Sequence, residues 1–330
     1  MNMFGNHLSL NGNLFLSNTD NLLSVSSLSF LTGIQNSWTN GGSLTNKGFD
    51  ASFTLKLLNT RKFQWEAGAA IGAYKNEITK LPGKPIETTA YGATLRTAVG
   101  EPVGVFYGYE TSKENKVFAT TQDAIDSNLK IFTDYGLEPV QAGDMHFVDQ
   151  NGDNIIDKKD RVKIGDPNPD FYGRIFTNLS YGNFTLNATM SYSVGGDIYN
   201  YQRMLLESGS RFMNQTLAMT NRWTAEGQVT EIPRADFEDP HGNARFSDRW
   251  IEDGSYLRLK NVTLSYKIPV MSTYLQGVTV WASANNLFTL TNYLGSDPEF
   301  STSNNVYTRG IDRGLLPQST NFSFGIKINL

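Results

Sequence analysis

The residues of this chain best suited to hold a metal ion lie together in one short stretch, residues 149–160, which reads DQNGDNIIDKKD. Its side-chain oxygens fall at positions 1, 3, 5, 9 and 12 of that stretch, and position 7 can offer a backbone carbonyl. The six residues are Asp149, Asn151, Asp153, Ile155, Asp157 and Asp160. Calcium takes about six to eight oxygen ligands, and a short loop with this spacing supplies them without help from distant segments. The stretch therefore predicts a structural Ca²⁺ site of the EF-hand type.

Three features of the same stretch depart from an ordinary EF-hand. Position 6, where glycine usually makes a sharp turn, is Asn154, which tolerates a left-handed backbone better than most residues. The last position is Asp160 where glutamate is usual. No flanking helix is expected, because residues 161–164 are β-like and Pro167 and Pro169 follow them. The alternative interpretation is an acidic, solvated turn that binds no metal.

Side chains for enzyme catalysis form no familiar pattern in this sequence. The three histidines, His7, His146 and His241, are scattered, and there is no cysteine. GxSxG, P-loop, GxGxxG and HExxH motifs are also absent. His146 lies shortly before Asp149, so it is either an extra metal ligand or a histidine beside a turn. A formal net charge of −4 gives no reason to expect nucleic acid as a partner. We therefore expect a protein that is not an enzyme.

The composition favours many strands joined by turns. The 330 residues include 30 Gly, 20 Phe and 15 Tyr, and only 39% of them are hydrophobic. No run of about 18 apolar residues is present, so no transmembrane helix is expected. A membrane β-barrel is compatible with such a composition, because only every second residue of its strands meets lipid.

Strict alternation of apolar and polar residues marks the individual strands. It extends without a slip from Phe184 to Val194, directly after a turn signal at Gly182 and Asn183. Further alternating segments cover residues 8–16, 49–57, 63–73, 171–181, 262–268, 278–284 and 322–330. These segments predict about eight antiparallel strands, each with one apolar and one polar face.

The lengths of the connections between these strands alternate. We expect long connections at residues 18–44, 79–170, 195–253 and 290–317, and short ones at 59–62, 182–183 and 269–276. Long loops on one side and short turns on the other are typical of outer-membrane barrels, whose extracellular loops are long and periplasmic turns short. The sequence thus predicts an all-β fold, an antiparallel transmembrane β-barrel segment with long extracellular loops. A soluble β-sandwich is the alternative, but its loops need not sort by length.

Aromatic side chains are frequent in the expected long loops, where they could stack on sugar rings or dock a partner. They are Tyr199, Tyr201, Phe212, Trp223, Trp250, Tyr293 and Tyr307.

Several segments resemble the C-terminal part of the SusC/RagA family of TonB-dependent outer-membrane transporters. They are NKGFDASF, GEPVGVFYGYE, GDMHFVDQNGDNIIDKKDRVKIGDPNPDFYGRIFTNLSYGNFTL, GGDIYN, RWTAEGQVTEIPRA, WIEDGSYLRLKNVTLSYKIP and ASANNLFTLTNYLGSDPEF. The resemblance implies a barrel of about 22 strands with a plugged lumen, set in outer-membrane lipid. It also implies import of oligosaccharides or peptides with a SusD-like surface lipoprotein as partner.

By this resemblance, residues 1–330 are the C-terminal part of the barrel, and the plug and the segment that contacts the TonB complex are expected upstream of Met1. Such barrels usually end on an aromatic residue, whereas this chain ends on Leu330. Two further hypotheses stay open from the sequence: a self-contained eight-stranded outer-membrane barrel with binding or adhesive loops, and a soluble calcium-binding sandwich.

Overall fold

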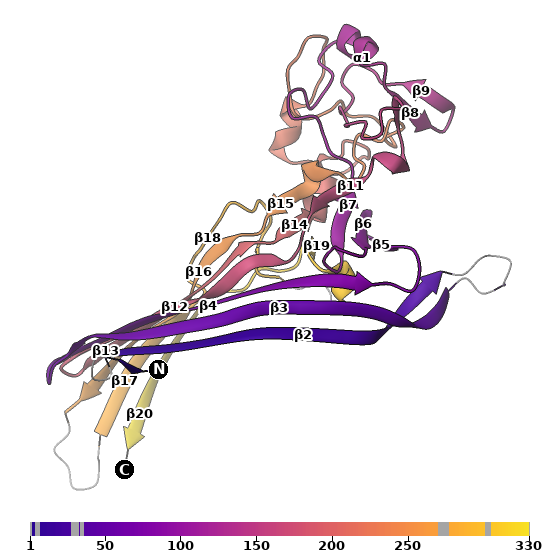
Figure 1. Ribbon diagram of the computed structural model, residues 1–330. Helices are drawn as coiled ribbons and strands as arrows, with labels where there is room; N and C mark the ends of the chain where they lie inside the picture. The colour runs from indigo at the N-terminus through magenta and orange to yellow at the C-terminus, as the bar shows by residue number, and fades with distance from the viewer. Residues whose placement is uncertain are drawn as a thin grey trace.

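The computed structural model describes residues 2–3, 7–27, 33, 36–269, 277–300 and 305–329. The expected turn after Pro269 and the terminal Leu330 lie outside these residues. Eight long antiparallel strands form one sheet, called the wall below, in chain order (Figure 1). They are β2 (Leu8–Ser27), β3 (Asn36–Asn59), β4 (Phe63–Lys80), β12 (Pro169–Tyr181), β13 (Phe184–Gly195), β16 (Tyr256–Ile268), β17 (Gly277–Asn285) and β20 (Asn321–Asn329). Short strands β1 (Asn2–Met3) and β18 (Thr289–Thr291) pair with β2 and β16.

The hairpin of β12 and β13 has the register that its alternation predicts. Tyr181 pairs with Phe184 across the turn, and the ladder extends to Pro169 opposite Gly195. Gly182 has a φ of 58°, the left-handed conformation that a tight two-residue hairpin turn needs. The predicted turn and both strands are confirmed.

The first two strands are much longer than predicted. Most of the stretch expected as a loop, residues 18–44, is strand, because β2 continues to Ser27 and β3 begins at Asn36. Residues 18–21 and 39–43 are all polar or glycine, so the alternation signal is interrupted there, yet the backbone ladder continues through register shifts around Leu22. Cross-strand hydrogen bonding, which does not depend on side-chain polarity, extends these strands.

One face of the wall is apolar, and no second layer of the described residues covers it. On β20 the side chains of Phe322, Phe324 and Ile326 are 65%, 79% and 68% exposed. The opposite face is polar, and on it Asn261 donates from Nδ2 to Ser283 Oγ at 2.9 Å. A sandwich would bury its apolar face against a second sheet, so the sandwich interpretation is wrong.

The connections on one end of the wall fold into a separate layer, the cap, made of residues 81–168, 196–255, 286–300 and 305–320 (Figure 1). Its strands are β5 (Ile86–Ala90), β6 (Ala93–Thr97), β7 (Val105–Gly108), β8 (Lys130–Thr133), β9 (Gly136–Pro139), β10 (Ile155–Ile156), β11 (Val162–Gly165), β14 (Asp197–Asn200), β15 (Ile251–Asp253) and β19 (Ile311–Asp312), with helices α1 (Thr121–Ser127) and α2 (Tyr201–Glu207). Short 3₁₀ turns complete it, including η2 (Lys158–Asp160) and η4 (Asp248–Trp250). Among the described residues, no helix is long and apolar enough to cross a membrane.

Two hydrophobic clusters hold the cap together. One joins its three connections through Ala93, Leu95, Phe106, Tyr199, Trp250 and Ile311. The other lies farther from the wall and contains Val117, Phe118, Ala124, Leu129, Ile131, Val140, Met145, Phe147 and Ile156. Since the first cluster draws on segments far apart in sequence, and Trp223 of the second connection packs against the other cluster, the cap is a packed unit and not a set of free loops.

Candidate functional site

The acidic stretch 149–160 forms a tight loop whose carboxylates accept backbone hydrogen bonds. Asp149 accepts from the N–H of Gly152 at 2.8 Å and of Asn154 at 2.7 Å. Asn154 has a φ of 61°, so position 6 takes the left-handed conformation that the loop requires. Asp160, which is 0% exposed, accepts from the N–H of Gln150 at 3.0 Å and of Asp157 at 2.7 Å. Asp149 and Asp160 therefore close the loop from its two ends.

A lysine lies beside the remaining carboxylates of this loop. Lys159 Nζ is 3.1 Å from Asp153 Oδ2 and 3.7 Å from Asp157 Oδ2. The hydrogen bond from Lys159 lowers the pKa of Asp153. Within the described ranges, no three His, Asp or Glu side chains converge as a metal cage would require. The six predicted ligands thus share one loop, but here its carboxylates are satisfied by N–H groups and an ammonium.

His146 packs against an aromatic ring. Its ring stacks on Phe118 with 4.4 Å between centroids, and Nδ1 lies 3.1 Å from the carbonyl oxygen of Asn115. Burial lowers the pKa of His146. These contacts favour packing over the alternative role of an extra metal ligand.

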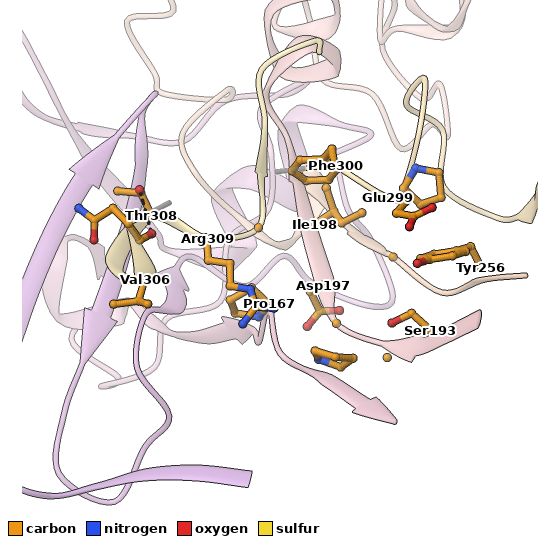
Figure 2. A pocket seen from close by; sticks show the side chains of 17 residues that line it. Pro167, Ser193, Asp197, Ile198, Tyr256, Glu299, Phe300, Val306, Thr308 and Arg309 are labelled. Atoms are coloured by element: carbon orange, nitrogen blue, oxygen red, sulfur yellow. Dashed lines mark hydrogen bonds between the residues drawn. The ribbon is translucent and has the colours of Figure 1, made fainter. Parts of the chain in front are cut away.

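A cavity of about 490 Å³ opens on the polar face of the wall, where three strands meet the cap (Figure 2). We call it the polar-face cavity. Ser193 and Tyr256 are cross-strand partners of β13 and β16, so they share this face. Asp197, Glu299 and Arg309 add charged groups from the cap. The other lining residues are Pro167, Pro169, Gly195, Gly196, Ile198, Gly254, Pro298, Phe300, Asn305, Val306, Thr308 and Gly310.

Ion pairs fix the cap side of this cavity. Arg258 on β16 donates from Nη1 to Glu299 Oε2 at 2.9 Å and also bonds Asp297. Lys260 lies 2.8 Å from the same Glu299 oxygen. Because Arg258 is only 3% exposed, its two carboxylate partners compensate a nearly buried charge. The loop that carries Glu299 is therefore anchored to the wall.

The other charged groups of the cavity differ in their surroundings. Burial raises the pKa of Asp197, which accepts a hydrogen bond from the N–H of Asp166 at 2.7 Å. Arg309 is exposed and donates to the hydroxyl of Tyr74 at 3.0 Å. An aromatic ring, carboxylates and a guanidinium around one opening can hold a polar solute by stacking and hydrogen bonds.

Comparisons with known proteins agree with this architecture. The fold matches the structure of the RagAB peptide transporter with a TM-score of 0.77 and 22% identity, over 99% of this chain and 34% of that one. The sequence is 32% identical over 99% of its length to TonB-dependent receptor P3 of Formosa agariphila. It is 26% identical over 94% of its length to TonB-dependent receptor SusC of Bacteroides thetaiotaomicron.

The chain belongs to the SusC/RagA family of TonB-dependent receptors. It spans 33% and 29% of the lengths of those two receptors, so it corresponds to about one third of each. No family model matches the sequence. The relatives of this SusC/RagA chain are named as receptors and transporters, and not as enzymes.

The polar-face cavity is the part of this SusC/RagA chain that sequence reasoning missed. Its polar groups come from four separate segments and share no spacing. Two of the loop aromatics considered as contacts, Tyr199 and Trp250, are instead core residues of the cap, 1% and 0% exposed. Phe212 is 95% exposed. Alternation along β13 could have placed Ser193 on the polar face, but nothing in the sequence says what covers it.

Proposed function

We propose that this chain forms part of the wall and the extracellular mouth of an outer-membrane TonB-dependent transporter that imports oligosaccharides or peptides. In this proposal a full-length parent receptor contains the chain, and its other parts supply the plug and the contact with the TonB complex. A SusD-like surface lipoprotein covers the cap side. The coverage of about a third of each relative supports a larger parent.

The observation that carries the proposal is the position of the polar-face cavity. A barrel that conducts a polar solute lines its lumen with polar side chains and meets lipid with apolar ones. The cavity lies on the polar face at the end of the wall that bears the cap, so a solute passing through the lumen would contact Ser193 and Tyr256. The sheet is also open, since the described residues contain no pairing between its ends at β1 and β20. Both features favour the transporter over the self-contained small barrel.

Filling the cavity tests the proposal. Ser193→Trp in the parent receptor places an indole in the cavity, whereas Val194→Trp places the same group on the opposite face of β13. We expect Ser193→Trp to lose most uptake of a fluorescent oligosaccharide or peptide, and Val194→Trp to retain it. Equal uptake by the two variants would contradict a luminal role for this face.

A parent receptor that always purifies alone from solubilised outer membranes would contradict the lipoprotein partner.

We further propose that the loop 149–160 binds Ca²⁺ with the oxygens of Asp149, Asn151, Asp153, Ile155, Asp157 and Asp160. Support comes from their EF-hand spacing, the left-handed Asn154 and the buried Asp160. Calcium would compete with the Lys159 ammonium, so Lys159→Met should bind it more tightly. Calorimetry measures calcium binding by the parent receptor and by its Asp153→Ala variant, which is the control. Equal calcium binding by both proteins, or none by either, would refute the site.

A further inference from the structure

A second cavity of about 560 Å³ lies inside the cap and shares no residue with the polar-face cavity. We call it the cap cavity. Its charged lining contains three cations, Lys116, Arg203 and Arg249, and three carboxylates, those of Glu207, Glu231 and Asp248. The remaining lining residues are Thr111, Met145, Ala218, Asn221, Thr230, Ile232, Ile251 and Leu294.

Two of the three cations have carboxylate partners. Lys116 Nζ is 2.8 Å from Glu231 Oε2. Arg203 on α2 is 3.1 Å from Glu207 and 2.8 Å from Glu252. Arg249 on η4 has no carboxylate oxygen within 4.0 Å among the described residues. Of the cations that line the cap cavity in the described residues, it alone forms no salt bridge, although the charges of Glu207 and Asp239 act on it from farther away.

The guanidinium of Arg249 is held by weak contacts only. It stacks on the Trp250 ring with 4.2 Å to the centroid, and Nη2 donates to the carbonyl oxygen of Glu207 at 3.3 Å. Nη1 is buried and has no hydrogen-bond partner in the described part of the chain. Burial, followed by the nearby charge of Arg203, lowers the pKa of Arg249 to about 9.

Another buried arginine of the cap, Arg245, provides a comparison, because its guanidinium donates hydrogen bonds to backbone carbonyls. Arg245 donates from Nε to the carbonyl of Gly242 at 2.8 Å and from Nη2 to that of His241 at 2.9 Å. Its guanidinium also lies 5.0 Å and 4.8 Å from the ring centroids of Tyr109 and Phe147. Since a buried charge without a partner destabilises the fold, Arg249 is a group that gains from a ligand.

We propose that the cap cavity binds a carboxylate group of the imported solute, with Arg249 as its counter-charge. Arg249 forms no salt bridge and its Nη1 has no hydrogen-bond partner in the described residues, so it can bind one carboxylate, and the three lining carboxylates disfavour a dianion such as phosphate. The carboxylate belongs either to a peptide C-terminus or to a uronic acid, and the apolar lining by Met145, Ile232 and Leu294 favours the peptide. This inference rests on the proposed function, because it assumes that solute reaches the cap.

The test compares matched probes on the parent receptor in detergent. N-acetyl-tetraalanine is titrated as the free acid and as the amide, and glucuronic acid is titrated against glucose. We expect the acid peptide to bind about tenfold more tightly than its amide, as one charge-assisted hydrogen bond would provide. Arg249→Gln should bring that ratio close to one, and Arg211→Gln, at an exposed arginine of the cap outside both cavities, should leave it unchanged. A ratio that depends on Arg249 for glucuronic acid, and not for the peptide, would identify a uronic acid as the source.

Two further measurements separate binding from folding. Removal of a buried guanidinium that forms no salt bridge should leave Tm unchanged or raise it, whereas a purely structural arginine would lower it when replaced. If Arg249→Gln does not fold, Ala218→Trp fills the cap cavity without changing charge and should abolish the preference. Equal binding of acid and neutral probes, absence of binding, or a preference that survives these substitutions would overturn the inference. The titrations need no transport, so they fail independently of the uptake test with Ser193→Trp.

Discussion

The wall and the cap use the same kinds of side chain in opposite ways. On the wall, Phe322 and Phe324 of β20 are 65% and 79% exposed. In the cap, Phe106 and Trp250 are 0% exposed. The wall therefore depends on an apolar environment outside the chain, whereas the cap builds its own core. The boundary between the two is where β4, β12, β13 and β16 end or begin.

The wall and the cap also differ in the kinds of polar group that they pair. The polar face of the wall carries neutral hydrogen-bonded pairs, such as Thr263 donating to Ser283 Oγ at 2.8 Å. The cap buries charges, and Asp144, 1% exposed, accepts from His241 Nδ1 at 2.8 Å and from Asn243 Nδ2 at 3.1 Å. Buried charges need specific partners, so the cap demands more precise packing than the wall.

The largest expected effect is aggregation of the wall when the chain is produced without the rest of the barrel. Isolated residues 1–330 should aggregate, because β20 pairs with β17 on one side only and β2 is covered at its outer edge only by the two-residue β1. Each unpaired backbone group in hydrocarbon costs several kcal/mol. Refolding in detergent, followed by a gel for a heat-modifiable monomer and by bilayer conductance, measures this. A compact, monodisperse barrel would instead favour the small-barrel hypothesis.

A smaller effect should follow from removing the centre of the cap core. Trp250→Ala in the parent receptor should cost about 3 to 5 kcal/mol of cap stability, because a fully buried indole leaves a cavity. Protease cleavage within residues 81–168 should increase while the barrel stays heat-modifiable. Trp38→Ala on β3, where the ring is 73% exposed, is the control and should change little. Loss of the barrel in Trp250→Ala would show that wall and cap are one folding unit.

The smallest expected effect concerns the ion pair between Asp297 of the cap and Arg258 of the wall. Burial by itself would raise the pKa of Asp297, but the hydrogen bond from Arg258 and those from the N–H groups of Gln318 and Glu299 bring it below its ordinary value. A depressed carboxylate stabilises the fold above the pKa of the unfolded chain, about 4, and this is lost as pH falls through the folded pKa.

Asp297→Asn should therefore lower cap stability by no more than about 1 kcal/mol at pH 7, and the difference from wild type should begin to shrink at about pH 4 and vanish below the depressed pKa of Asp297. Thermal unfolding of both proteins from pH 7 down to below that pKa measures this difference. A difference that is constant with pH would mean that Asp297 acts by packing and not by charge.

Local patterns in the sequence were sufficient for much of the wall. Alternation from Phe184 to Val194 and the turn at Gly182 fixed the hairpin, since both are properties of neighbouring residues. The left-handed Asn154 of the acidic loop was predictable for the same reason. The ends of β2 and β3 were not, because the alternation is interrupted at residues 18–21 and 39–43 and only backbone pairing carries the strands past that point.

The sequence by itself determined the antiparallel strands, their two faces and the resemblance to the SusC/RagA family. Only the tertiary structure decided that Trp250 is core and that Ser193 and Arg309 line one cavity. It also decided that, among the described residues, Arg249 forms no salt bridge and its Nη1 has no hydrogen-bond partner. The physical reason is that alternation is set by adjacent residues, whereas burial and charge compensation depend on which distant segments meet, and no spacing along the chain encodes that meeting.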